Sequence, residues 1–308
     1  MNVSVSILGA GEFAATRSEE ADGVSYPHDL AAIEADTPEA VATAWESIAV
    51  DSPEQRGALA SQIDIAFGGL AMLGECPLWS AKTGTLLWID TDGHTLNRFD
   101  PDTGRNAAHG MPDVVGMIAE RKDGTLLVAI RCDLATVNDD GEVTRFATAP
   151  HEPTGFLYRY DPDGSWHVMD DGFTLINGLD WNPDHRTLYV TDSRVPAIYA
   201  YDHDPLTGVI DNRKVFATFR PADGFPDGLL VDDDGTIWST LFDGGTIQQI
   251  GSDGRFGQRI ELPVSRPTSC CFSADRQLLY VTTARLGLAG EQMKREPLAG
   301  ALLAVQMV

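Results

Sequence analysis

The sequence predicts an all-β protein of the β-propeller type, and two observations support this prediction. A polar residue followed by alternating apolar residues recurs five times, beginning at Thr85, Thr125, Thr187, Thr236 and Gln277. Asp-Gly pairs such as Asp123-Gly124 stand between these segments, and they supply the positive φ that tight hairpins need. Units of about 40–50 residues built from short strands are typical of propeller blades.

A second recurring strand ends each unit, and it is present six times. These strands are Leu96–Asp100, Leu134–Asn138, Phe156–Asp161, Ile198–Asp202, Ile247–Ser252 and Ala301–Gln306. The first pattern skips the unit that ends near Asp161, because the interval from Thr125 to Thr187 is too long for one blade and too short for two. We therefore expect a six-bladed β-propeller in which blade three is truncated within residues 146–153.

The first part of the chain has a different character, which predicts an N-terminal extension over residues 1–65 and a propeller domain over residues 66–308. Asp36 followed by Pro38 is typical of a helix start, with a capping residue and a proline in the first turn. Ser52-Pro53 predicts a second helix by the same argument, with Ile63 on its apolar face. The extension is therefore expected to be short and partly helical.

Composition excludes several classes of partner and location. The net charge is −24, whereas nucleic acids and anionic membranes are bound by basic surfaces, so neither is expected. No apolar run reaches the roughly 18 residues of a membrane span, and the first residues lack the basic segment of a signal peptide. A cytoplasmic protein is the resulting expectation. The four cysteines form no CxxC pair and are expected to be free thiols.

Three residues with oxygen-bearing side chains precede the repeated pattern at comparable positions in blades one, four and five. They are Glu75, Asn177 and Asp227. The inner strands of a propeller converge on its central channel, so these side chains are expected to meet there. Two carboxylates and an amide oxygen suit one divalent cation: Ca²⁺, Mg²⁺ or Mn²⁺, with Zn²⁺ as a further possibility. The alternative is that Asn177 and Asp227 are turn residues, since each precedes a glycine.

Four segments in order resemble the SMP-30/gluconolactonase/regucalcin family: Leu73–Trp79, Asn177–Trp181, Pro226–Asp232 and Thr268–Phe272. The resemblance covers roughly residues 66–308. It implies a six-bladed propeller with one divalent cation in the central channel and hydrolysis of sugar lactones. It further implies that Glu75, Asn177 and Asp227 hold the cation, and that Asp227 is the catalytic general base.

The chain departs from the family pattern at two places. Cys76 stands where the family usually has glycine, and a non-glycine residue at positive φ costs about 1–2 kcal/mol. The Asn-Asp-Gly motif that binds substrate in the family is absent from the truncated region, so no substrate-binding residue is assigned. No Gly-x-Ser-x-Gly sequence is present either, which disfavours a serine hydrolase.

The leading functional hypothesis is therefore a divalent-metal-dependent lactonase that acts on a small sugar lactone. Two alternatives remain open at this point. The protein could be a metal-binding propeller whose catalysis is impaired or lost, because the truncated region lacks the substrate motif. It could also be a scaffold that binds other proteins through its loops. The sequence leaves the particular lactone, the cation and the oligomeric state unassigned.

Overall fold

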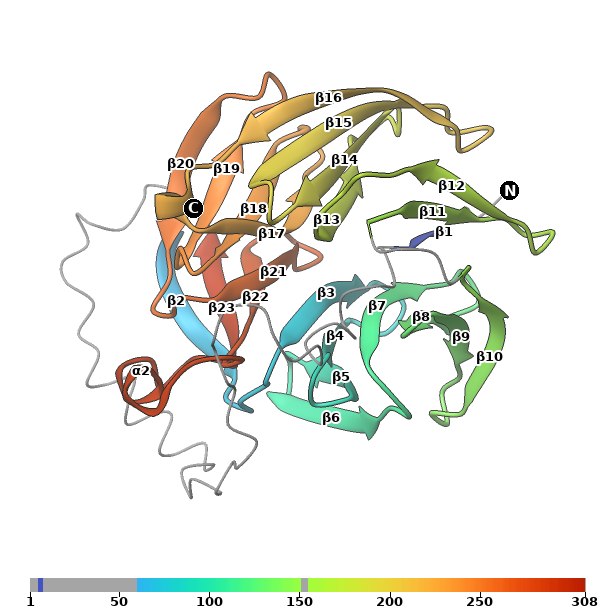
Figure 1. Ribbon diagram of the computed structural model, residues 1–308. Helices are drawn as coiled ribbons and strands as arrows, with labels where there is room; N and C mark the ends of the chain where they lie inside the picture. Colours follow the sequence, from blue (N-terminus) through green and yellow to red (C-terminus); the bar gives the residue numbers. More distant parts are fainter. Residues whose placement is uncertain (1–4, 8–59, 151–154, 308) are drawn as a thin grey trace.

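Antiparallel β-strands joined by short turns form nearly all of the fold (Figure 1). The computed structural model describes residues 5–7, 60–150 and 155–307. Figure 1 shows the sheets arranged around a central axis, each with one edge towards it. The expectation of an all-β propeller is confirmed.

Five sheets have four strands each and form complete blades. The first blade comprises β3 (Gly74–Ser80), β4 (Thr85–Asp90), β5 (Thr95–Asp100) and β6 (Arg105–Gly110). The second comprises β7 (Val115–Glu120), β8 (Leu126–Ile130), β9 (Asp133–Val137) and β10 (Val143–Thr148). The next two comprise β13 (Ile176–Trp181), β14 (Thr187–Asp192), β15 (Ala197–His203) and β16 (Ile210–Thr218), and then β17 (Phe225–Val231), β18 (Ile237–Phe242), β19 (Thr246–Ile250) and β20 (Phe256–Glu261).

The last blade is completed by a strand from the opposite end of the described propeller. It comprises β21 (Pro267–Phe272), β22 (Leu278–Thr283), β23 (Leu302–Met307) and the outer strand β2 (Ala60–Phe67). β2 pairs antiparallel with β23, with Ile63 opposite Val305. The residues of β2 alternate between polar and apolar at Gln62, Ile63, Asp64 and Ile65, which is the period of a strand. This pairing ties the first and last strands of the propeller together.

The prediction of a six-bladed propeller is wrong, because the structure has five blades. The unit that was expected to form blade three contributes only β11 (Leu157–Tyr160) and β12 (Trp166–Asp170). β10 ends at Thr148, so the connection to β11 is too short to hold two further strands. β1 (Val5–Ile7) pairs with β11 instead, and the result is a three-stranded sheet in the order β1-β11-β12. Among the described residues no further strand pairs with β1, so this sheet has one strand fewer than a complete blade.

The prediction of a helical N-terminal extension is also wrong for the residues that the structure describes. The helix start at Asp36 and the capping signal at Ser52 lie outside the described residues. Ile63, which was assigned to a helix face, lies in strand β2 because its segment alternates with period two. The single α-helix within residues 5–7, 60–150 and 155–307 is α2 (Gly290–Arg295), and a 3-10 turn, η3, covers Pro221–Asp223.

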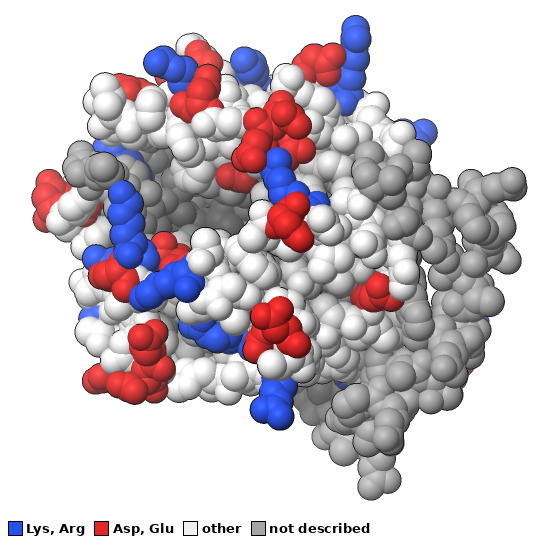
Figure 2. Space-filling model, turned by 180° about the vertical axis from the view of Figure 1, so that it is seen from behind, with Lys and Arg blue, Asp and Glu red and all other residues white. Residues whose placement is uncertain are grey.

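The inner strands contact one another in a fixed sequence around the axis. β13 contacts β17, β17 contacts β21, β21 contacts β3, and β3 contacts β7. The three-stranded sheet lies between the blades that begin with β7 and β13, as Figure 1 shows. It packs on one neighbour through Tyr160 and Trp166 against Leu134, and on the other through Leu157 against Leu188. The face seen in Figure 2 is hollowed on the side where this sheet lies.

The hydrophobic core is divided among the contacts between neighbouring blades. Ile89 and Val128 pack together between the first two blades, and Ile198 and Leu241 between the blades of β13–β16 and β17–β20. Burial of side chains on both faces explains why the second strand of each blade is almost continuously apolar. None of the four cysteines, all of which lie within the described residues, forms a disulfide, as expected. No helix among the described residues is long and apolar enough to cross a membrane.

Because β2 closes the last blade, its apolar residues should contribute to the stability of the whole propeller. Ile63 is partly buried and packs against the core of the last blade. Ile63→Ala should lower the free energy of unfolding by about 1–2 kcal/mol, measured by urea denaturation. Gln62→Ala, at the neighbouring exposed position, is the matched control and should change it by less than about 0.5 kcal/mol. Equal effects of the two substitutions would mean that β2 does not close the blade.

Candidate functional site

Glu75, Asn177 and Asp227 lie on inner strands of three different blades: β3, β13 and β17. Each stands where the pairing of its strand with the next one is interrupted. The register shifts between Glu75 and Leu78, between Ile176 and Leu179, and between Pro226 and Leu229. Such bulges change the direction of a side chain relative to a regular strand. All three residues therefore lie at the bulge of an inner strand: Asn177 and Asp227 stand inside the interruption, and Glu75 is the last paired residue before it.

Close approach of the inner strands explains the glycines next to these residues. A Cβ atom on Gly178 would lie 2.3 Å from the backbone nitrogen of Leu229 and 2.7 Å from the carbonyl oxygen of Asp227. A Cβ atom on Gly228 would lie 2.4 Å from Oγ of Ser269. Only glycine fits at these two positions, because any side chain would collide with the neighbouring blade. This close approach brings Gly178, the residue after Asn177, next to the backbone of Asp227.

In β3 the residue that directly follows Glu75 is Cys76. Its φ is 47°, in the left-handed region that favours glycine. The thiol lies 3.6 Å from the carbonyl oxygen of Gly116 on β7, and the side chain packs on the core between the first two blades. The departure from the family pattern at Cys76 therefore falls on a strained backbone position, as the sequence led us to expect.

Glu75 and Asp227 are buried carboxyl groups that interact with each other. Their exposed fractions are 9% and 5%. Burial raises the pKa of Glu75 to about 8, and a hydrogen bond from the backbone of Cys76 opposes this shift. Burial also raises the pKa of Asp227 well above its ordinary value, and the nearby charge of Glu75 raises it further. Neither carboxyl group forms an ion pair with any residue that the structure describes.

One oxygen of this pair has no partner. Oδ1 of Asp227 is buried and forms no hydrogen bond within the described part of the chain. A buried polar atom without a partner is unfavourable by about 1–3 kcal/mol, and more when it is charged. Nδ2 of Asn177 donates a hydrogen bond to Oγ of Ser193 (3.3 Å), which leaves its amide oxygen available. The site thus presents oxygen acceptors and lacks a positive charge to balance them.

These donors fit a hard divalent cation. Carboxylate and amide oxygens are the ligands that Ca²⁺, Mg²⁺ and Mn²⁺ prefer, and water completes their coordination. Within residues 60–150 and 155–307 no three His, Cys, Asp or Glu side chains form a metal-binding cluster. A cation at this place would therefore need Asn177 in addition to Glu75 and Asp227. This ligand set remains a prediction.

The equivalent positions of the other two blades complete a ring around the axis. In β7 the register shifts between Val115 and Met117, so Gly116 is the residue at this position and offers no side chain. In β21 it shifts between Pro267 and Ser269, which places the fully buried Thr268 there. Thr268 follows Pro267 in β21 as Asp227 follows Pro226 in β17, and this shared placement after a proline could have identified it from the sequence.

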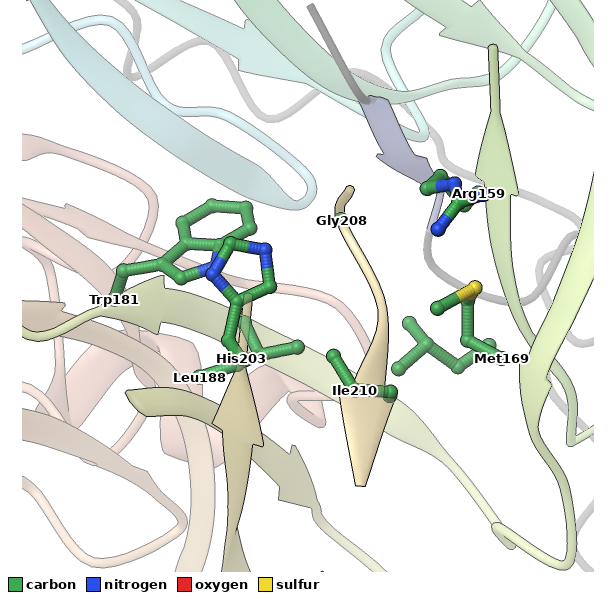
Figure 3. A pocket seen from close by; sticks show the side chains of 8 residues that line it. Arg159, Met169, Trp181, Leu188, His203, Gly208 and Ile210 are labelled. Carbon is green, nitrogen blue, oxygen red and sulfur yellow. The ribbon is translucent and has the colours of Figure 1, made fainter. Parts of the chain in front are cut away.

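A separate pocket lies away from this ring, between the three-stranded sheet and the β13–β16 blade (Figure 3). Leu157, Met169, Leu188 and Ile210 give it apolar walls. Its polar neighbours are Arg159, whose guanidinium pairs with Asp161, and His203, whose ring lies near Trp181. None of the three candidate ligands lines it, so the pocket belongs to the joint between two sheets.

Three comparisons with known proteins place the chain in a family. The family model described as SMP-30/gluconolactonase/LRE-like region matches residues 73–156 and 148–285. The two matched segments overlap at residues 148–156, which is where the connection between β10 and β11 lacks two strands. The match covers more than half of the chain and includes Glu75, Asn177 and Asp227.

Relatives with known names agree with this match. Regucalcin of Xenopus laevis is 31% identical over 266 residues, covering 75% of this chain and 89% of the relative. Pentonolactonase XacC of Haloferax volcanii is 29% identical over 237 residues, covering 69% and 81%. The crystal structure of a calcium-binding regucalcin from Agrobacterium tumefaciens has the same fold, with a TM-score of 0.74 at 22% identity over 79% of this chain and 93% of that one. The chain therefore belongs to the SMP-30/gluconolactonase/LRE-like family.

Proposed function

We propose that this protein hydrolyses sugar lactones in a reaction that depends on one divalent cation held by Glu75, Asn177 and Asp227. The observation that carries the proposal is the pair of buried, interacting carboxyl groups, one of which has an oxygen without a partner. A positive charge between them would remove both the repulsion and the unsatisfied acceptor. A pentonolactonase among the relatives supports the choice of lactones as substrates.

Each residue would have a distinct task. Glu75 and Asn177 would hold the cation from two sides, because they lie on inner strands of different blades. The bound cation would polarise the lactone carbonyl and stabilise negative charge on its oxygen. Asp227 would accept a proton from the attacking water and return it to the ring oxygen as the ester bond breaks. Its free Oδ1 is an acceptor suited to this proton.

The three-stranded sheet favours a second candidate function, namely cation binding with weak catalysis. In this sheet, which lies between the β7–β10 and β13–β16 blades, β1 is an edge strand with which no strand of the described residues other than β11 pairs. In the family this region supplies the substrate motif, so fewer groups would orient the sugar here. Orientation can contribute on the order of 7–11 kcal/mol to catalysis in the best cases. We therefore expect slow hydrolysis of small, labile lactones with poor discrimination among sugars.

The proposal is tested by assaying several aldonolactones with protein freed of metal by a chelator, and then with Ca²⁺, Mg²⁺, Mn²⁺ or Zn²⁺ added back singly. Hydrolysis should be at background level without metal and should return with at least one cation. Cation binding without hydrolysis would favour the second candidate. Full activity in the presence of chelator would contradict the proposed cation dependence.

Asp227 is expected to contribute most to catalysis. Asp227→Asn should lower kcat/KM by about 100-fold or more, because it removes the proton acceptor with little change of shape. Asn177→Ala should mainly raise the cation concentration needed for half-maximal activity. Asp139→Asn, at an exposed turn position, is the matched control and should leave both parameters unchanged. If Asp227→Asn keeps wild-type activity, Asp227 is not the general base.

The raised pKa values predict how stability depends on pH when metal is absent. Between the ordinary pKa of Glu75, near 4.5, and its folded value of about 8, the folded state holds more protons than the unfolded state. Stability should therefore fall as pH rises through this window, by up to about 1.4 kcal/mol per pH unit. Urea denaturation from pH 5 to pH 8 measures this slope. Glu75→Gln should flatten it, and an unchanged slope in this variant would show that Glu75 does not titrate there.

The strained position of Cys76 predicts an unusual response to substitution. Cys76→Gly should stay within about 1 kcal/mol of the wild type, because relief of the positive φ offsets the lost contacts of the thiol. Cys76→Val should destabilise the fold by about 2 kcal/mol or more, because a β-branched residue tolerates this conformation poorly. Cys271→Val, in a regular strand, is the control. Equal unfolding midpoints for the two valine variants would contradict strain at Cys76.

A further inference from the structure

Two buried threonine hydroxyl groups connect the strands that carry Glu75 and Asp227. Thr240 on β18 and Thr268 on β21 are both fully buried, with exposed fractions of 0%. Their hydrogen bonds leave their own strands and reach the backbone of other strands and blades. Most side-chain hydrogen bonds in proteins are made to backbone groups or water, and here the backbone acceptors belong to other strands.

Thr268 connects the last blade to the first. Its Oγ1 donates a hydrogen bond to the carbonyl oxygen of Gly74 on β3, the residue directly before Glu75. Oγ1 of Thr282 lies 2.9 Å from the same hydroxyl and supplies a second contact within the blade. The peptide group that joins Gly74 to Glu75 is therefore held by a side chain of a different blade.

Thr240 makes the corresponding connection on the Asp227 side. Its Oγ1 lies 3.1 Å from the carbonyl oxygen of Gly228, the residue directly after Asp227, and 2.6 Å from the carbonyl oxygen of Thr268. One hydroxyl proton is shared between these two acceptors. A continuous path of hydrogen bonds thus runs from Gly228 through Thr240 and Thr268 to Gly74.

These bonds occur where the ordinary pairing of strands fails. The register shift after Glu75 and the one around Asp227 interrupt the ladder between the first and second strands of each blade. The pairing within each blade therefore constrains the backbone least at the two carboxyl groups. The threonine hydroxyls supply a constraint at these places, and because they bridge blades they also fix one carboxyl group relative to the other.

We propose that Thr240 and Thr268 are positioning residues that set the separation of Glu75 and Asp227 and thereby the affinity of the cation site. The inference deepens the proposed function and rests on it. Neither threonine is expected to touch the substrate or the cation. Loss of a group that hydrogen-bonds to a metal ligand or its backbone, without binding the metal itself, typically weakens metal affinity by about 10–100-fold.

The chain offers two matched controls. Thr283 lies on β22 of the last blade, is buried, and donates a hydrogen bond of 2.6 Å to the carbonyl oxygen of Ala301. Thr283→Val therefore removes a similar hydrogen bond that is not part of the path between Gly228 and Gly74. Thr191 faces the bulge of its own blade as Thr240 does, but its buried hydroxyl has no hydrogen-bond partner in the described residues. Thr191→Val therefore removes a hydroxyl without breaking a bond.

The test measures two quantities for each variant of the full chain: the Ca²⁺ affinity, by calorimetric titration, and the unfolding temperature. Thr268→Val and Thr240→Val should each weaken Ca²⁺ binding about 10-fold or more. Thr268→Ser and Thr240→Ser keep the hydroxyl and should restore it to within about 3-fold of the wild type. Thr283→Val should lower the unfolding temperature as Thr268→Val does, yet bind Ca²⁺ like the wild type.

Wild-type Ca²⁺ affinity in both path valine variants would overturn the proposal. Serine variants as weak as the valine variants would also overturn it, because packing of the methyl group would then be responsible. If the wild type binds no Ca²⁺, the cation part of the proposed function fails. In that case, crystal structures of the metal-free Thr240→Val and Thr268→Val variants test the positioning role. Carbonyl groups of Gly74 and Gly228 that are displaced from their wild-type places would support it, and unmoved carbonyl groups would refute it.

Discussion

The repulsion between two buried carboxyl groups is the constraint on which the proposed function of this propeller depends. Glu75 and Asp227 come from different blades, have almost no contact with water, and lack a basic partner among the described residues. Such a pair is unfavourable in a fold unless it is protonated or binds a cation. The raised pKa values of both groups express this cost. A site of this kind is maintained at the expense of stability, which is typical of functional residues.

The architecture provides the rigidity that this arrangement needs. Five four-stranded blades pack face to face, and β2 and β23 join the two ends of the propeller. Bulges in the inner strands lie at Glu75, Asn177 and Asp227, and Gly178 and Gly228 allow the strands to approach closely there. The three-stranded sheet lies in the remaining sector, and among the described residues no fourth strand pairs with its edge strand β1.

Local patterns in the sequence predicted most of the fold and pointed to the candidate ligands. The repeated alternation from Thr85 onwards located the second strand of each blade, and the residues before it included Glu75 and Asp227. Non-local contacts escaped the same reasoning. β1 is defined by pairing with β11, far along the chain, and the blade count was wrong because the loop after β10 is too short for the missing strands. A capping signal at Ser52 suggested a helix through Ile63, where pairing with β23 imposes a strand.

The bulges and the threonine path were equally hidden from the sequence. Thr240 and Thr268 resemble ordinary strand residues until the blades are assembled, because their acceptors lie on other strands. Cys76 was recognisable as a departure from a family glycine, but the structure was needed to show that its φ is positive. Residues whose role depends on the contact between blades therefore require the structure, whereas residues at repeated positions do not.

The most direct measurement is the number of protons released when a divalent cation binds to the wild-type protein near pH 7. Calorimetric titration with Ca²⁺ or Mn²⁺ in two buffers of different ionisation enthalpy gives this number. Because burial raises the pKa of Glu75 to about 8, its carboxyl group is largely protonated near pH 7, and binding of one cation should release about one proton. Binding without proton release, or no binding of any divalent cation, would contradict a cation site at these two carboxyl groups.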